Sequence, residues 1–220
     1  MNKFKGIIFD FNGTLILDDE LHIAAYQKYV DEIGLSFTRE EYFKNMHGRP
    51  NDRIYEFLKG EPIPKELSGV FGLQKEVYYR EMFAQSPPPF AKGAVEMLDY
   101  LKDKGVPMAI ATSSEISNVT FFREVYNLDR WFAGHITYSD GTIKGKPAPD
   151  IFLKAGENLG LPMSSLVTVE DSFSGVCACE ASGSSLVVGI CPRGKEKFNG
   201  IEHTDLVITD FTEFDYKNLF

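Results

Sequence analysis

The sequence predicts an α/β protein in which a parallel sheet with crossover helices is interrupted by a helical domain. Two patterns predict this class. Short apolar runs alternate with helical patterns along most of the chain, and a stretch of about seventy residues after the first run shows helical patterns without a convincing strand. At 220 residues and 43% hydrophobic composition, the chain is long enough to bury the core of such a fold.

Five apolar runs predict the strands. Each run ends at small or polar residues, as buried parallel strands do, and the runs lie at 4–9, 107–111, 166–169, 185–190 and 206–208. The crossover helices are expected where apolar residues recur at helical spacing before a closing glycine or loop residue, at 94–104, 116–126, 149–159 and 175–182.

The helical insertion follows the first predicted strand. Its helical patterns lie at 21–33, 39–46, 51–58 and 73–83. The segment Ser86-Pro87-Pro88-Pro89 predicts a stiff, extended return, because proline fixes φ and disfavours helix in the residue before it. We therefore expect a core formed by residues 1–15 and 88–220 and a separate helical domain at 16–87, with hinges at both boundaries.

The charge balance argues against nucleic acid and membrane partners. A net charge of -9 does not favour an extended surface for polyanions, which need clustered Lys and Arg. The apolar run before Asp10 is too short for a secretory signal or a membrane span, and three cysteines without paired spacing suggest neither disulfides nor zinc. We expect a cytoplasmic protein that is a monomer or a weak homodimer.

Polar side chains gather where the predicted strands end, which is where open parallel sheets bind ligands. They form the segments Asp10-Phe11-Asn12-Gly13-Thr14, Thr112-Ser113-Ser114, Lys144-Gly145-Lys146-Pro147 and Glu170-Asp171-Ser172. Taken singly, such residues are also turn residues, helix caps or solvated surface groups. Their joint placement at successive strand ends favours a site.

These residue types suit phosphoryl transfer. The Asp10 carboxylate can attack phosphorus to form an aspartyl phosphate, and Asp10 with Glu170 and Asp171 offers the hard oxygen ligands that Mg²⁺ prefers. Thr112 and Lys146 would bind the transferring oxygens. The segment also contains a glycine next to Asn12 that would let backbone amides approach the phosphate.

Four motifs in order resemble those of haloacid dehalogenase (HAD) superfamily hydrolases, specifically the β-phosphoglucomutase-like phosphatases. They are DFNGT at 10–14, IATSS at 110–114, KPAPDIF at 146–152 and VEDSFSG at 169–175. The resemblance covers most of the chain. It implies a Rossmann-like parallel sheet core, known as the HAD fold, with the helical domain as an inserted cap.

The resemblance also implies roles for the matching positions. Asp10 is expected to be the nucleophile, with Thr112, Lys146 and the backbone at Gly13 binding phosphate. The magnesium ligands are expected to be three carboxylates and one backbone carbonyl, from Asp10, Asn12, Glu170 and Asp171. By similarity, Ser113 and Asn118 line the phosphate pocket, with a plain loop or helix-cap role equally open.

Asn12 departs from the family pattern. The phosphatases and mutases carry a second aspartate there, which protonates the leaving alcohol and then activates water, a role worth about 10²- to 10⁴-fold in rate. An amide cannot exchange that proton. Four explanations stay open: a slow phosphatase for an undemanding leaving group, proton transfer by Asp18, Asp19 or His22, ligand binding without turnover, or an engineered change.

Specificity is expected to come from the cap, where His22, Arg49 and Lys75 are candidates for substrate contact. A structural role is an alternative for His22, and a surface salt bridge is one for Arg49. The favoured function is a magnesium-dependent phosphatase of a small phosphorylated metabolite, with sugar phosphates first. The alternatives are a β-phosphoglucomutase-like mutase and a catalytically impaired protein that binds a phosphorylated ligand.

Overall fold

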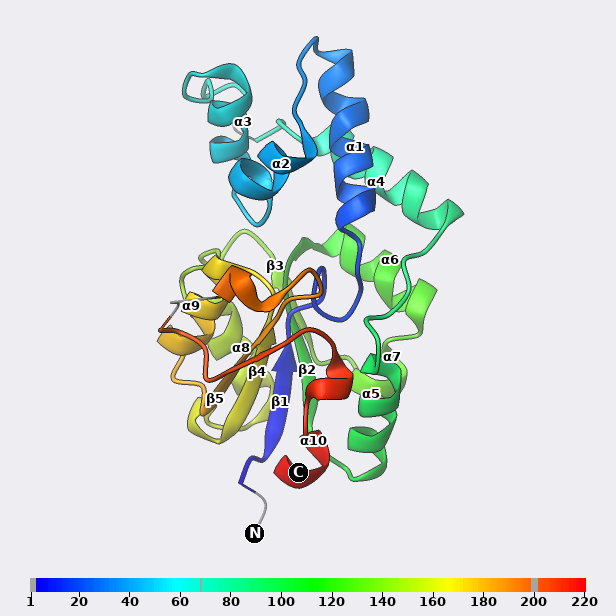
Figure 1. Ribbon diagram of the computed structural model, residues 1–220, viewed down its shortest axis with the longest axis vertical. Helices are drawn as coiled ribbons and strands as arrows, with labels where there is room; N and C mark the ends of the chain where they lie inside the picture. The colour runs from blue at the N-terminus through cyan, green and yellow to red at the C-terminus, as the bar shows by residue number, and fades with distance from the viewer. Residues whose placement is uncertain (1–2, 68, 199–201) are drawn as a thin grey trace. The chain divides into compact units, whose positions relative to one another are not determined.

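The computed structural model describes residues 3–67, 69–198 and 202–220, without the side chains of residues 196 and 197. It contains two compact units (Figure 1). One comprises Met1–Leu17 and Pro89–Phe220, called here the core unit, and the other comprises Asp18–Pro88, called here the helical unit. The catalytic division of labour between core and cap stays a prediction.

A parallel sheet organises the core unit and confirms the predicted α/β class. Among the described residues it has six strands in the order β3-β2-β1-β4-β5-β6. Their bounds are β1 Gly6–Phe9, β2 Met108–Glu115, β3 Ile136–Ser139, β4 Leu166–Glu170, β5 Leu186–Ile190 and β6 Leu206–Ile208. The sequence prediction missed β3, because this edge strand is short and three of its four residues, Thr, Tyr and Ser, are not aliphatic.

Helices cover both faces of this sheet. Their bounds are α5 Ala94–Asp103, α6 Ile116–Tyr126, α7 Asp129–Phe132, α8 Asp150–Leu159, α9 Phe173–Ala181 and α10 Tyr216–Leu219, with short 3₁₀ turns at Met163–Ser165, Lys195–Phe198 and Phe211–Glu213. Successive residues of β1 point to opposite faces. Ile8 joins a buried cluster with α8 and α9 residues, and Phe9 packs edge-on against Phe132 and Phe211.

The helical unit has its own aromatic core. It consists of α1 Asp19–Glu32, α2 Arg39–Glu41, a π-helical turn at Tyr42–Met46, α3 Asn51–Lys59 and α4 Leu73–Gln85. Tyr26, Phe37, Tyr42 and Tyr55 are buried in one cluster, as expected for aromatic residues used as core packing. In the part of the chain that the structure describes, no helix is both long enough and apolar enough to cross a bilayer.

Candidate active site

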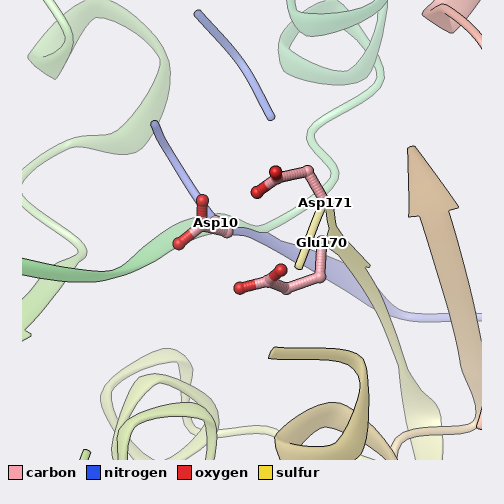
Figure 2. Close-up of side chains that lie close together, drawn as sticks. All are labelled: Asp10, Glu170 and Asp171. Atoms are coloured by element: carbon pink, nitrogen blue, oxygen red, sulfur yellow. The ribbon is translucent and has the colours of Figure 1, made fainter. Parts of the chain in front are cut away.

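The carboxyl ends of the neighbouring central strands β1 and β4 bring three carboxylates together. Phe9 of β1 pairs with Val169 of β4, and Asp10 N donates to the Val169 carbonyl at 2.9 Å, so the residues after both strands lie side by side. One carboxylate oxygen from each of Asp10, Glu170 and Asp171 can be chosen so that all lie within 4.8 Å of one another. Figure 2 shows the three side chains facing a common space. All three residues are buried.

Lys146 reaches the same space from the loop before α8. Its Nζ donates to Asp10 Oδ1 at 2.6 Å and to Glu170 Oε1 at 2.7 Å, and lies 3.3 Å from the Ala111 carbonyl oxygen. Only 7% of its side chain is exposed. The ammonium therefore bridges the predicted nucleophile and one predicted metal ligand, instead of being a solvated surface lysine.

Burial and charge together set the protonation of this group. Burial raises the pKa of Asp10 well above its usual value, and the neighbouring Glu170 and Asp171 add to the rise while Lys146 opposes it. Burial alone would raise the pKa of Glu170, but Lys146 and hydrogen bonds from Ser172 lower it. Burial would lower the pKa of Lys146, but Asp10 and Glu170 outweigh it and raise that pKa above its usual value.

The charge balance of this cluster fits a divalent cation. Three buried carboxylates face one ammonium, so negative charge is in excess in a place that water reaches poorly. Carboxylate oxygens are the ligands that Mg²⁺ prefers, and a bound cation would favour the ionised form of Asp10. The residues present therefore suit the metal that the sequence predicted.

Ser172 and Gly175 hold Glu170 from the other side, and the sequence prediction gave neither a role. Ser172 donates from its backbone N–H and its hydroxyl to Glu170 Oε2, at 2.6 and 2.9 Å. The same hydroxyl accepts from Gly175 N and caps α9. A Cβ at Gly175 would lie 1.8 Å from Glu170 Cδ, so no larger residue fits there. Both residues stand in the VEDSFSG motif, which was the available signal.

A close approach also explains Gly13. Its φ is +78°, a conformation that favours glycine, and a Cβ there would lie 2.8 Å from Asp171 Cγ. The loop that contains it is closed by a hydrogen bond from Gly13 N to the Ile16 carbonyl at 2.8 Å. Gly13 thus lets the Asp10 loop pack directly on the Asp171 carboxylate, beside its expected role at a phosphate.

The end of β2 places a hydroxyl beside Asn12. The pairing of β2 with β3 shifts register between Thr112 and Glu115, an irregularity that redirects the intervening residues. Ser114 N donates to Thr112 Oγ1 at 3.1 Å, and Ser114 Oγ donates to Asn12 Oδ1 at 2.9 Å. Thr112 is buried and does not cap α6, whose N-cap is Glu115.

Ser113 and Asn118, the other two residues assigned to the phosphate pocket, follow Thr112 in the chain but differ in solvent exposure. Ser113 is exposed at the end of β2, and Asn118 is buried in the first turn of α6. Their contact with phosphate stays a prediction.

In the helical unit, His22 and Lys75 belong to one hydrogen-bonded network, in which Lys75 is buried and His22 is partly exposed. Lys75 Nζ donates to His22 Nδ1 at 2.8 Å and to Glu76 Oε1 at 2.9 Å. His22 Nε2 lies 3.2 Å from Asp18 Oδ2 on the other side of the ring. Asp18 also accepts from the Tyr79 hydroxyl at 2.5 Å, and the His22 ring stacks on Tyr79.

The remaining candidate of the helical unit is outside this network. Arg49 is exposed, and its Nη2 donates to the Lys44 carbonyl at 3.3 Å. The structure thus brings His22 and Lys75 together, whereas Arg49 belongs to a separate loop. Substrate contact by any of the three stays a prediction.

Comparisons with known proteins agree with this geometry. A family model described as haloacid dehalogenase-like hydrolase matches residues 7–188. A Thermotoga maritima protein named phosphorylated carbohydrates phosphatase is 25% identical over 190 residues, covering 84% of this chain and 85% of that protein. A family IA, variant 3 HAD hydrolase from Entamoeba histolytica is 33% identical, with a TM-score of 0.90 and coverage of 98% and 97%. A variant of CbbY from Rhodobacter sphaeroides, solved with xylulose-1,5-bisphosphate, is 25% identical, with a TM-score of 0.76 and 96% of each chain covered.

Proposed function

The chain belongs to the haloacid dehalogenase-like hydrolases, and we propose that it is a magnesium-dependent phosphatase that forms an aspartyl phosphate on Asp10. The observation that carries this proposal is the buried cluster of Asp10, Glu170 and Asp171 with Lys146 between two of them. A nucleophilic carboxylate, hard oxygen ligands and a fixed ammonium are the groups that a phosphoryl transfer needs.

Each side chain then has a distinct task. Lys146 fixes the orientation of the Asp10 carboxylate and presents positive charge to the transferring oxygens. Glu170, which Lys146 and Ser172 hold on both oxygens, keeps that lysine in place. Thr112 would donate its hydroxyl proton to a phosphoryl oxygen.

The metal would be held by residues at the carboxyl ends of the same two strands, β1 and β4. Asp10, Asp171 and Glu170, with the backbone carbonyl of Asn12, would hold Mg²⁺, which when bound neutralises the charge of the phosphate and the carboxylates. Asp10 would attack only as a carboxylate, and a bound cation would favour that ionised form against the burial that raises its pKa.

We favour a small phosphorylated metabolite as the substrate, with sugar phosphates tested first. Support comes from the name of the Thermotoga phosphatase and from the sugar bisphosphate in the CbbY structure. His22, Arg49 and Lys75 remain the proposed contacts for the part of the substrate beyond the phosphate.

Phosphate release from a panel of sugar phosphates, with Mg²⁺ or with EDTA, tests this proposal. We expect Mg²⁺-dependent release that Asp10→Asn abolishes, and acid-quenched peptide mapping should find the phosphoryl group on Asp10. Asp103→Asn, which changes an exposed acid at the end of α5, is the matched control and should keep full activity. Release that survives in Asp10→Asn would contradict the proposal.

Asn12 favours one rival function, a protein that binds phosphorylated ligands without turning them over. This rival predicts Mg²⁺-dependent binding of a sugar bisphosphate with no phosphate release across the panel. A phosphosugar mutase would instead convert its substrate only when a bisphosphate activator is added, so the panel is run with and without one.

A further inference from the structure

We infer that the preferred substrates carry their phosphoryl group on an oxygen that leaves as a stable anion: acyl phosphates, enol phosphates and phosphoanhydrides, and anomeric esters among the sugar phosphates. This inference rests on the proposed function, because it concerns the same displacement at Asp10. It goes beyond that function by naming the chemistry of the leaving group.

The first observation is the orientation of the Asn12 side-chain amide, which a hydrogen bond from Ser114 holds. Asn12 lies two residues after Asp10 and is partly accessible to solvent. Its Oδ1 accepts from Ser114 Oγ at 2.9 Å, and Ser114 is itself tied to Thr112 through its backbone N–H. The oxygen edge of the amide is thus turned to β2, and the other edge carries N–H donors. An amide is a hydrogen-bond donor and acceptor, but it has no proton that it can transfer to a leaving oxygen.

The second observation concerns the titratable groups that surround this position in the described part of the core unit. Glu170 accepts from Lys146 on one oxygen and from Ser172 on the other. Lys146 Nζ donates to Asp10 Oδ1 at 2.6 Å and to Glu170 Oε1 at 2.7 Å, so its N–H groups are engaged with these two carboxylates. Asp10 is the nucleophile and Asp171 faces it across the space for the metal. None of these groups is placed to act as a general acid while it keeps its other task.

The two half-reactions balance without a general acid. In the first, an Asp10 oxygen attacks phosphorus, the bond from phosphorus to the leaving oxygen breaks, and the electron pair departs with that oxygen as a carboxylate, enolate or phosphate anion. In the second, water attacks the aspartyl phosphate, the bond from phosphorus to Asp10 breaks, and the pair returns to the carboxylate. The proton lost by water ends on the product phosphate.

This chemistry has two kinetic consequences. An alkoxide from a primary hydroxyl leaves poorly without a proton, so the first half-reaction is slow for such esters. We expect kcat/KM to fall at least about 10²-fold between an acyl phosphate and a primary alkyl phosphate, the lower end of what a general acid contributes. For good leaving groups we expect the second half-reaction to limit turnover, since Asn12 cannot activate water and the described core-unit groups named above have other tasks, so the phosphoenzyme accumulates.

The experiment compares acetyl phosphate, 4-nitrophenyl phosphate, glucose 1-phosphate and glucose 6-phosphate on three proteins with Mg²⁺. The native protein should show the steep decline in that order, and Asn12→Asp should flatten it to within about tenfold by supplying an acid. Asn12→Ala is the matched control, because it also lacks an acid and should keep the decline. Intact mass after acid quench should find phosphoenzyme from acetyl phosphate in the native protein and little in Asn12→Asp.

Rates within tenfold across the four substrates in the native protein would overturn the inference and leave the proposed function standing. The same holds if Asn12→Ala flattens the series. No release and no phosphoenzyme from any substrate would instead overturn the proposed function, and this inference with it. The native series decides the question even if Asn12→Asp fails to fold.

Discussion

The core unit and the helical unit each hold a lysine whose side chain is almost fully buried, but the two lysines have different partners. Lys146 and Lys75 are 7% and 4% exposed. The carboxylates that hold Lys146 are 8% and 2% exposed, whereas Glu76 and His22, which hold Lys75, are 27% and 22% exposed. The first lysine is thus the counter-charge of buried anions, and the second has partners that reach water.

The difference separates a cluster with an excess of negative charge from a network in which acids and donors are matched. Around Lys146, three carboxylates face one ammonium, so negative charge is in excess unless a cation binds. Around Lys75, two acids, Asp18 and Glu76, are matched by one ammonium, an imidazole and a tyrosine hydroxyl, and the ammonium lies 4.5 Å from the centre of the Tyr26 ring. Removing each lysine should therefore have unequal effects.

The largest effect is expected from Lys146→Met. It would leave Asp10 and Glu170 buried without their counter-charge, at a cost of about 3–5 kcal/mol in the free energy of unfolding at neutral pH without metal. It should also lower kcat at least about 10²-fold, because a fixed positive charge at the phosphoryl oxygens is lost. Denaturant unfolding and phosphate release measure the two effects.

The loss of stability in Lys146→Met should depend on pH in a definite direction. In the native protein Glu170 has a lowered pKa, so its contribution to stability exists above its unfolded pKa and is lost as the pH falls through the folded pKa. In the variant both carboxylates can take up protons on acidification. The stability difference between native and variant proteins should therefore shrink as the pH falls, and a constant difference would contradict the electrostatic explanation.

The next effect is expected from Ser172→Ala, which removes one hydroxyl from Glu170 and from the α9 cap. We expect a loss of about 2 kcal/mol, since both a cap and a hydrogen bond to a charged group disappear. The rate of phosphate release should fall as well, because Ser172 holds Glu170 and Glu170 in turn holds Lys146. Ser172→Thr keeps the hydroxyl and should restore both values, and failure to restore them would assign the loss to packing alone.

The two lysines also show how far a sequence predicts a structure. Lys146 was predictable because it stands in a recognisable motif ahead of a helix, and because its partners Asp10 and Glu170 lie at the carboxyl ends of β1 and β4, which parallel pairing brings together. The burial of Lys75 was not predictable, since its partner His22 lies 53 residues away in sequence and contact between α1 and α4 depends on tertiary packing. The role of Ser172 was missed because a serine before a helix has an adequate explanation as a cap.

Lys75→Met should have a smaller effect than Lys146→Met. We expect a loss of about 1–2 kcal/mol, because Glu76 and His22 can turn to water while Asp18 keeps its bond from Tyr79. Hydrogen exchange of α1 and α4 measures the local loss, with exposed Lys44→Met as the control. If Lys75 also contacts substrate, KM should rise while kcat stays within about tenfold.

The smallest effect is expected at the start of α2, where the helical unit uses an exposed cap instead of a buried charge. The Thr38 hydroxyl accepts from Glu41 N at 3.2 Å, and the Glu41 carboxylate accepts from Thr38 N at 2.7 Å. Thr38→Ala should cost about 1 kcal/mol, measured by hydrogen exchange of the amides from Glu41 to Met46, and Thr38→Ser should cost far less. The Thr38 backbone bond lowers the pKa of Glu41, so the stabilisation from Glu41 exists above its unfolded pKa and is lost as the pH falls through the folded one. A deficit in Thr38→Ala that grew in acid would contradict this account, because the reciprocal bond of Glu41 weakens there in both proteins.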